Sequence, residues 1–385
     1  MRIAHVIPAL VKGGAEKVVV DLANCAVANG DEVTLILAQP SPPELLACEL
    51  KPEVKVLHIC EGQPGRLSRY AMLARWLVRN RPLIRAFDVL HCHLSFGSAA
   101  GTLARWMRRG QPGPAIIETF HAAGMPIPGW KLALLARLAR RRDALVLVAE
   151  DSFWRRFKSR NPDVPVTVIP NGIAIDRKRP TPTEITAYRQ GIGIPRTCGS
   201  IVGTLGRLVD ERKPEYLIKA FAAMAETAEE DLHFVMGGAG PSLEPLKALA
   251  GEAGLSGRIH FPGLVMDPAL LFALCDLYVS VNVGPVTGIA GLEAAAFGIP
   301  VIALQASADY PDGAADWIWS SADPRAVGVE ALRLLRSPTK LQEMADRQRQ
   351  HVVERHSADA MSARYAELYR RVLQRLRGRS EPLEQ

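Results

Sequence analysis

Two permanent cations follow an apolar run in the second half of the chain, in the stretch TLGRLVDERKP. Arg207 comes directly after a run that ends in glycine, and Lys213 lies six residues further on, before the next helical pattern. Such cations are poor core material, but they bind the oxygens of a diphosphate well. Arg212 is an alternative to Lys213, because either side chain can point inward. A solvated charged loop is the competing interpretation.

A single carboxylate, Glu293, lies in an otherwise small and apolar helical pattern, GLEAAAFG. The N–H groups of Gly288 and Ile289 are suited to cap a phosphate. Glu293 follows one turn deeper, where it can accept hydrogen bonds from sugar hydroxyls. A buried carboxylate without a partner is costly, and the sequence identifies no arginine partner for it. We therefore interpret Glu293 as a ligand-binding residue.

Two glycine-rich turns precede other helical patterns. Gly13 and Gly14 in VKGGAEK let backbone N–H groups approach an anion at a helix N-terminus. Gly238 in VMGGAGP makes a similar tight approach. A simple turn explains either stretch equally well. VKGGAEK is not the G-x-G-x-x-G fingerprint, and no acid ends the following strand, so a dinucleotide oxidoreductase is disfavoured.

Three histidines follow or end apolar runs. His121 in ETFHAAG ends a strand pattern before a glycine loop, which suits a polar contact with a ligand. His91 and His93 alternate in VLHCHL and face one side of a strand end. With Cys92 they look like a metal cluster, but no further ligand is spaced suitably, so we expect no metal. The chain also contains no Asp-x-Asp, no G-x-S-x-G and no Walker loop.

These residues need a scaffold, and apolar runs alternate with helical patterns from end to end. This alternation predicts parallel sheets covered on both faces. With 385 residues the chain suggests two doubly wound α/β domains, joined by the Arg-, Lys- and Pro-rich segment 173–182. Ligands of such sheets bind beyond the carboxyl ends of the strands.

The composition is that of an ordinary globular protein, and no apolar run is long enough to span a bilayer. We expect no signal peptide, since His5 and Pro8 interrupt the first apolar stretch. The six scattered cysteines suit reduced thiols in a cytoplasmic protein.

The net charge of +7 is unevenly distributed along the chain. Residues 1–180 carry 26 Lys+Arg against 15 Asp+Glu, whereas the remainder carries 21 against 25.

Residues 129–143, GWKLALLARLARRRD, combine Trp130 and a leucine-rich face with four arginines: Arg137, Arg140, Arg141 and Arg142. Basic amphipathic helices favour anionic membrane surfaces, although an ordinary packed helix with a solvated basic end has the same pattern. Aromatic residues make up 6% of the chain and no nucleic-acid-binding module is present, so we expect no nucleic-acid partner.

Seven segments together resemble the retaining glycosyltransferases of family 4. In chain order they are GGAEKVVVDLA, ETFHA, VIPNGI, GRLVDERK, GAGPSLEPLKALA, GRIHFPGL and GLEAAAFGIPVIA. The resemblance implies a GT-B fold, in which two Rossmann-like domains face each other across a cleft. Residues 1–175 would form an acceptor-binding domain, joined by a C-terminal helix at 358–377. Residues 176–357 would then bind the nucleotide-sugar.

The resemblance also implies roles for individual residues. His121 would contact the donor sugar, Arg207 and Lys213 would bind the diphosphate, and Glu293 would hold the nucleotide ribose. The remaining implied contacts are with the donor phosphates or sugar: Gly13, Gly14, Gly238, Thr287, Gly288 and Ile289. The family has a second glutamate where this chain has Pro285, which leaves the identity of the transferred sugar open.

The implied activity is a retaining, metal-independent transfer of a hexose-like sugar from a nucleotide-diphosphate sugar, UDP- or GDP-linked. The expected acceptor is a bacterial cell-envelope glycan or lipid-linked molecule, as in polysaccharide or lipopolysaccharide biosynthesis. The expected location is the cytoplasm, including the inner face of the cell membrane. Another GT-B enzyme, such as a nucleotide-sugar epimerase, and a non-catalytic sugar-nucleotide-binding relative remain alternatives. No cofactor is expected.

Overall fold

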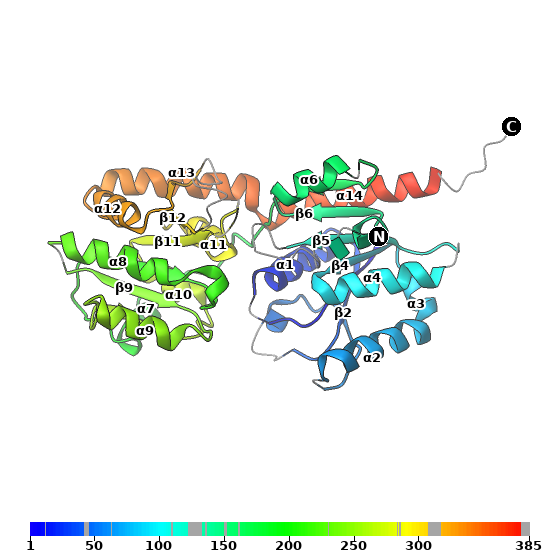
Figure 1. Cartoon of the computed structure of the whole chain (residues 1–385), viewed down its shortest axis with the longest axis horizontal. Coiled ribbons are helices and arrows are strands. Elements are labelled where there is room, and N and C mark those ends of the chain that lie inside the picture. The colour runs from blue at the N-terminus through cyan, green and yellow to red at the C-terminus, as the bar shows by residue number, and fades with distance from the viewer. Residues whose placement is uncertain are drawn as a thin grey trace. The chain divides into compact units, whose positions relative to one another are not determined.

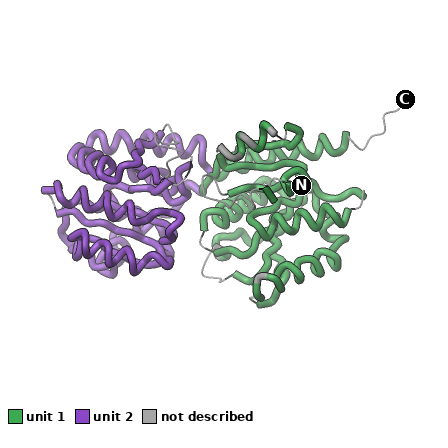
Figure 2. The backbone as a smooth tube through the Cα atoms, viewed as in Figure 1, with its two compact units in different colours: residues 1–123, 127–173, 358–385 green, residues 124–126, 174–357 purple. Residues whose placement is uncertain are grey.

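The protein consists of two compact α/β units, which Figure 2 colours separately. Unit 1 comprises residues 1–123, 127–173 and 358–385, and unit 2 comprises residues 124–126 and 174–357. This confirms the predicted fold class. The computed structural model describes residues 1–11, 13–41, 46–62, 64–108, 111–121, 133–134, 137–149, 152–160, 162–229, 231–282, 284, 286–306 and 317–378.

Unit 1 is built on a seven-stranded parallel sheet in the order β3-β2-β1-β4-β5-β6-β7 (Figure 1). The strand order reverses between β1 and β4, and ligands of open parallel sheets bind at such a reversal, beyond the carboxyl ends of the strands. The strands are β1 (Arg2–Ile7), β2 (Glu32–Leu37), β3 (Lys55–His58), β4 (Val89–His93), β5 (Ala115–Phe120), β6 (Ala144–Leu147) and β7 (Val166–Val168).

Helices connect these strands and cover the sheet. Apolar side chains of α2 and α4 pack on the sheet in one continuous core, which includes Leu73, Leu77, Phe96, Ile36 and Ile116. The helical elements of unit 1 are α1 (Gly14–Ala28), η1 (Leu46–Glu49), α2 (Arg66–Arg79), α3 (Arg81–Arg85), α4 (Leu94–Arg108), α6 (Ser152–Arg160) and α14 (Ala358–Gly378).

Unit 2 repeats the topology with a six-stranded parallel sheet in the order β10-β9-β8-β11-β12-β13. Its strand order reverses between β8 and β11, so a ligand is expected where these two strands end. The strands are β8 (Ile201–Leu205), β9 (His233–Gly237), β10 (Ile259–His260), β11 (Leu277–Asn282), β12 (Val301–Gln305) and β13 (Ser320–Ser321).

Local signals fix the ends of several helices in unit 2. Thr181 and Glu184 form a capping box at the start of α7, and Gly298, with φ of +94°, ends α11 in the left-handed conformation that favours glycine. The helical elements are α7 (Pro182–Gly191), η2 (Asp210–Arg212), α8 (Glu215–Thr227), α9 (Leu243–Glu252), α10 (Pro268–Leu274), α11 (Ile289–Phe297), α12 (Pro324–Leu335) and α13 (Pro338–His356).

The last helix, α14, groups with unit 1, where it packs against α1 and β5. The predicted apolar spacing at Met361, Tyr365, Leu368 and Val372 is confirmed, because all four side chains are buried. No helix in the described part of the chain is both long and apolar enough to span a bilayer.

Candidate functional site

Three cations lie on the loop between β8 and α8. Arg207 and Lys213 are exposed, whereas Arg212 is half-buried, and its guanidinium lies close to Gly206. Burial lowers the pKa of Arg212, and the neighbouring charge of Arg207 lowers it further. None of the three side chains has an ion-pair or hydrogen-bond partner among the described residues. Three cations without counter-ions at a sheet's carboxyl edge provide strong anion-binding capacity.

The backbone around these cations is unusual at one position. Lys213 has a φ of +53°, a left-handed conformation that side-chain-bearing residues adopt rarely. It ends the short turn η2, whose last residue is Arg212. Whether Arg212 or Lys213 binds the diphosphate together with Arg207 therefore stays open, because Arg212 is half-buried and Lys213 is exposed.

Gly238 is required by packing. A Cβ atom at Gly238 would lie 1.8 Å from the carbonyl oxygen of Gly206, and the φ of Gly238 is +138°. The N–H of Gly206 donates to the carbonyl of Gly237 at 3.0 Å. These contacts hold the loop after β9 against the cationic loop after β8, so a structural role accounts for this glycine.

The loop after β11 presents a buried hydroxyl to the start of α11. Thr287 is 6% exposed, and its Oγ1 has no hydrogen-bond partner in the described residues. Gly288 is the N-cap of α11 and Ile289 is its first residue, so the free N–H groups of the helix begin here. A buried hydroxyl without a partner is rare in native proteins and is consistent with a ligand oxygen at this position.

The same loop lies over a layer of buried polar side chains. Ser280 Oγ donates to Asn282 Oδ1 at 3.0 Å, and Gln305 Nε2 donates to the carbonyl of Gly284 at 3.2 Å. Gln305 is 1% exposed and its Oε1 accepts no hydrogen bond within the described residues. Polar groups rather than apolar ones therefore support the edge where β11 and β12 end.

Glu293 has the arginine partner that we could not identify from the sequence. Arg177 Nη2 donates to Glu293 Oε1 at 2.7 Å, and Arg177 also lies 3.6 Å from Asp267 Oδ1. The Glu293 side chain is 10% exposed and that of Arg177 is 26% exposed. The argument that Glu293 must bind a ligand because it lacks a partner was therefore wrong. Arg177 belongs to the segment we interpreted only as a linker, where Arg179 also donates to the carbonyl of Phe297.

In unit 1, Gly13 and Gly14 begin α1, which follows β1. Gly13 is the N-cap with extended backbone, and Gly14 is the first helical residue. A Cβ on Gly13 would meet the flexible Glu16 carboxylate at 2.3 Å rather than any backbone atom. The close approach at Gly13 therefore involves a side chain that can move, unlike the approach at Gly238.

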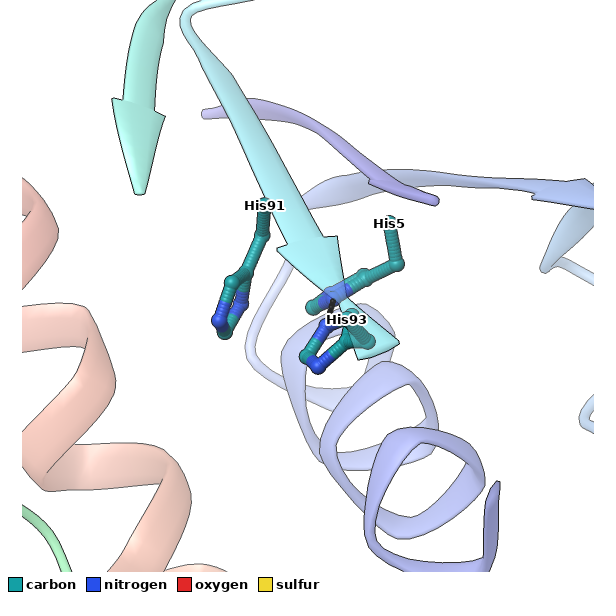
Figure 3. Close-up of side chains that lie close together, drawn as sticks. All are labelled: His5, His91 and His93. Carbon is teal, nitrogen blue, oxygen red and sulfur yellow. Dashed lines mark hydrogen bonds between the residues drawn. The ribbon is translucent and has the colours of Figure 1, made fainter. Parts of the chain in front are cut away.

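His121, directly after β5, belongs to a cluster of imidazoles at the ends of neighbouring strands. His121 Nε2 lies 3.0 Å from His93 Nδ1, and His93 Nε2 lies 3.0 Å from His5 Nδ1. His91 Nδ1 lies 2.7 Å from the Tyr369 hydroxyl, and His91 Nε2 lies 2.7 Å from Thr119 Oγ1. Figure 3 shows His5 and His93 turned toward each other, with His91 beside them.

Burial keeps these imidazoles neutral. His5, His91 and His93 are 0% exposed, and desolvation lowers the pKa of His5 to about 3 and the pKa values of His91 and His93 well below their usual range. His121 is partly exposed, and burial lowers its pKa to about 4. The cluster therefore carries no charge at neutral pH.

The reason we gave against a metal at His91 and His93 was also incomplete. His5 supplies a third imidazole, with nitrogen atoms of all three residues within 4.8 Å of one another. Sequence reasoning missed it because β1 and β4 are far apart in the chain, although His5 pairs with His91 in the parallel register. Both nitrogens of His91 and of His93 already have hydrogen-bond partners, so a metal ion would have to break existing bonds. Metal independence remains a prediction.

A hollow of about 190 Å³ lies near the ends of β1 and β4 in unit 1. It is lined by Pro8, Arg69, Tyr70, Ser95 and Phe96. Arg69 Nε is buried and has no hydrogen-bond partner in the part of the chain that the structure describes. The hollow thus combines an aromatic wall with a cation.

The predicted basic membrane segment needs a correction. Arg142 is 4% exposed and its Nε donates to Glu118 Oε2 at 2.6 Å, so it is an internal ion pair and not part of a basic surface. Arg137, Arg140 and Arg141 are exposed. Trp130 and Pro285 lie outside the described residues.

Two parallel doubly wound α/β units are the architecture of the GT-B glycosyltransferases, and the family matches agree with this class. Residues 12–177 match the family described as Glycosyltransferase Family 4, and residues 192–351 match Glycosyl transferases group 1. The chain therefore belongs to these glycosyltransferases.

Individual relatives agree with this assignment. The chain is 28% identical to a 2-deoxystreptamine glucosyltransferase of Streptomyces kanamyceticus over 50% of this chain and 49% of that protein, so the match spans about half of that relative. It is 24% identical to a D-inositol 3-phosphate glycosyltransferase of Thermobispora bispora over 94% of this chain and 91% of that protein.

Solved structures share the fold. Anabaena Alr3699/HepE in complex with UDP and glucose has a TM-score of 0.76 at 18% identity, covering 96% of this chain and 99% of that chain. WaaG, a glycosyltransferase involved in lipopolysaccharide biosynthesis, has a TM-score of 0.65 at 17% identity, covering 95% and 99%.

Proposed function

We propose that the protein is a retaining, metal-independent glycosyltransferase that uses a nucleotide-diphosphate sugar. The observation that carries the proposal is the set of cations without counter-ions after β8, Arg207, Arg212 and Lys213, on the same sheet edge as the start of α11. Glycosyl transfer develops negative charge on the departing diphosphate. Fixed cations and helix N–H groups stabilise that charge more in the transition state than in the ground state.

We propose that unit 2 binds the donor. Arg207 and Lys213 bind the diphosphate, with Arg212 beside them, and Glu293 binds the ribose. The Thr287 hydroxyl and the N–H groups of Gly288 and Ile289 bind phosphate or sugar oxygens, which gives the buried Thr287 Oγ1 a partner. Gly238 shapes this edge, and Gly13, Gly14 and His121 of unit 1 contact the donor phosphate and sugar, as the family resemblance implies.

We propose that unit 1 binds the acceptor, in the hollow that includes Arg69 and Tyr70. An arginine beside aromatic side chains suits an acceptor that carries both an anionic group and apolar or sugar surface. Relatives include a GDP-mannose-dependent phosphatidylinositol monomannoside mannosyltransferase of Mycolicibacterium smegmatis, 27% identical over 62% of this chain and 66% of that protein. This relative supports a lipid-linked acceptor, and we place the reaction at the inner face of the cell membrane as part of the proposal.

The proposal is tested with a panel of nucleotide-sugars that includes UDP-glucose and GDP-mannose, with release of the nucleoside diphosphate as the measurement. Arg207→Ala and Lys213→Ala are each expected to lower turnover roughly 10²-fold, by analogy with the loss of one oxyanion donor. Lys247→Ala is the matched control, because Lys247 pairs with Glu244 on the exposed surface of α9. Near-normal turnover in both site variants would reject the diphosphate assignment.

Pro285 favours one alternative, a relative that binds nucleotide-sugars without transferring them. Its side chain cannot accept a hydrogen bond from a sugar hydroxyl, as the glutamate of the family would. Nucleotide-sugar binding without product in the wild-type protein, together with a gain of transfer in Pro285→Glu, would support this alternative. Transfer by the wild-type protein would reject it.

A further inference from the structure

The imidazole cluster of unit 1 contains a continuous chain of hydrogen-bonded rings, of which the proposed function uses only His121. The chain runs from His121 through His93 to His5, across the ends of the adjacent strands β5, β4 and β1. Both links are 3.0 Å long and both join one ring nitrogen directly to another (Figure 3 shows the inner link).

Proton counting restricts how this chain can be arranged. A neutral imidazole has one N–H donor and one acceptor nitrogen. His93 uses both nitrogens within the chain, so it must donate through one and accept through the other. The two hydrogen bonds therefore point the same way along the chain, and the proton positions of all three rings are set together.

The two ends of the chain show which direction is favoured. His5 Nε2 is buried and has no partner in the described part of the protein. If His121 donates to His93 and His93 donates to His5, then His5 Nε2 carries an N–H with nothing to bind. In the opposite direction His5 Nε2 carries only a lone pair. In either direction one buried N–H lacks a partner among the described residues, on His5 Nε2 in the first direction and on His121 Nδ1 in the second. His5 is 0% exposed, whereas His121 is partly exposed at the end of its strand, so an N–H without a protein partner costs less on His121 and the second direction is preferred.

The second direction has a consequence at the other end. Each ring then carries its proton on Nδ1, so His121 Nδ1 becomes an N–H donor. This atom is buried and finds no partner within the residues that the structure describes. It is therefore available to an oxygen atom of a ligand.

Neighbouring groups hold the chain in place. The rings of His91 and His93 have centroids 4.0 Å apart, and His91 is bound on both sides by Tyr369 and Thr119. Thr119 Oγ1 in turn lies 2.9 Å from the Tyr365 hydroxyl. Both tyrosines come from the C-terminal helix α14, so this helix helps to orient His93 through His91.

We propose that His93 and His5 are positioning residues that hold neutral His121 with its proton on Nδ1, so that His121 donates a hydrogen bond to an acceptor oxygen of the nucleotide-sugar. The identity of the ligand rests on the proposed function, whereas the proton positions do not. The low pKa values of the three rings agree with this, because a charged ring would carry protons on both nitrogens.

The proton positions are measured in the free protein by ¹⁵N NMR with labelled histidine, using His5→Phe and His93→Phe to assign the rings. We expect His5, His93 and His121 to carry the proton on Nδ1 at neutral pH. Protons on Nε2 of His93 and His5 would overturn the proposal. Stoichiometric binding of added Zn²⁺ that shifts these signals would also overturn it, in favour of a metal site.

The effect on the reaction is measured with UDP-glucose and GDP-mannose. His93→Phe keeps a planar ring but cannot accept or donate, and we expect kcat to fall roughly 10- to 100-fold, as for other partners that orient a functional histidine. His93→Asn places an amide near the position of Nδ1, where it can donate to His121 Nε2, so we expect it to regain most of the lost rate. His260→Phe is the matched control, because His260 Nε2 lies 2.9 Å from His233 Nδ1 in a similar pair within unit 2.

Equal losses in His93→Phe and His93→Asn, or a similar loss in His260→Phe, would show that packing rather than proton position matters and would overturn the proposal. If His93→Phe does not fold, His93→Asn and His5→Phe decide between the outcomes. A wild-type protein that neither binds nor turns over any nucleotide-sugar would reject the proposed function, while the NMR result would still test the proton positions.

Discussion

Glu293 can stabilise unit 2 through its ion pair with Arg177, or it can bind the ribose of the nucleotide. One set of variants separates these two roles. The pair holds the segment after Ile173 against α11, and its atoms are 2.7 Å apart with side chains 26% and 10% exposed. Two unit charges at about 4 Å attract by roughly 4 kcal/mol at an effective dielectric constant of 20, but desolvation offsets much of this. We expect Arg177→Met and Glu293→Gln each to lower the free energy of unfolding of unit 2 by about 1–3 kcal/mol.

Urea denaturation of both single variants and of the double variant gives the coupling energy. We expect about 1–2 kcal/mol of coupling, because the second substitution removes a group that has already lost its partner. Exposed Lys247→Met on α9 is the control for loss of a lysine–glutamate pair with little stabilising effect. Additive single effects would show that the two side chains do not stabilise each other.

Nucleotide affinity distinguishes the second use. If Glu293 accepts hydrogen bonds from the ribose, Glu293→Gln should weaken binding of UDP or GDP by roughly 10- to 150-fold, from about 1.5–3 kcal/mol for hydrogen bonds to a charged group. Arg177→Met should leave binding within about 3-fold, because Glu293 keeps its carboxylate. Isothermal calorimetry measures both. Equal losses in the two variants would mean that Glu293 only supports α11, and unchanged binding in Glu293→Gln would refute the ribose contact.

Three further results are expected. First, His5, His91 and His93 have folded-state pKa values below that of an unfolded histidine, so unfolding takes up protons. The free energy of unfolding should therefore fall as the pH falls below about 6.5, by about 1.4 kcal/mol per pH unit for each ring. Urea midpoints that stay constant between pH 7 and pH 5 would contradict this. Transfer should persist in EDTA, and activity that a chelator abolishes and Mn²⁺ or Mg²⁺ restores would contradict metal independence. Binding to anionic vesicles should weaken with salt, since each exposed basic residue near such a surface contributes about 1 kcal/mol, and equal sedimentation with neutral vesicles would count against it.

Much of the fold could be predicted because local patterns agree with the tertiary structure. Alternating apolar runs and helical patterns gave two parallel sheets, and the buried positions of α14 followed from its spacing. The candidate loops after β8 and β11 could be predicted for the same reason, since the carboxyl ends of parallel strands meet at one edge.

The partners of individual side chains could not be predicted, because they come from segments far apart in the sequence. Glu293 binds Arg177, which is 116 residues away, and His5 joins His93, which is 88 residues away. Arg142 in a basic stretch pairs with Glu118 on a buried strand. A pattern along one segment contains no information about these distances, and an inference from a missing partner is correspondingly weak.

Net charge alone also fails to indicate where a diphosphate binds. The first 180 residues carry the excess of positive charge, yet Arg142 in that half is buried and pairs with Glu118 at 2.6 Å. Arg207, Arg212 and Lys213 lie in the half with more acidic than basic residues, but they have no counter-ions among the described residues. Coulombic attraction for a ligand depends on charge that remains unpaired near the site. The cations of unit 2 therefore suit a diphosphate, whereas the neutral imidazoles of unit 1 suit the hydroxyl and ether oxygens of a sugar.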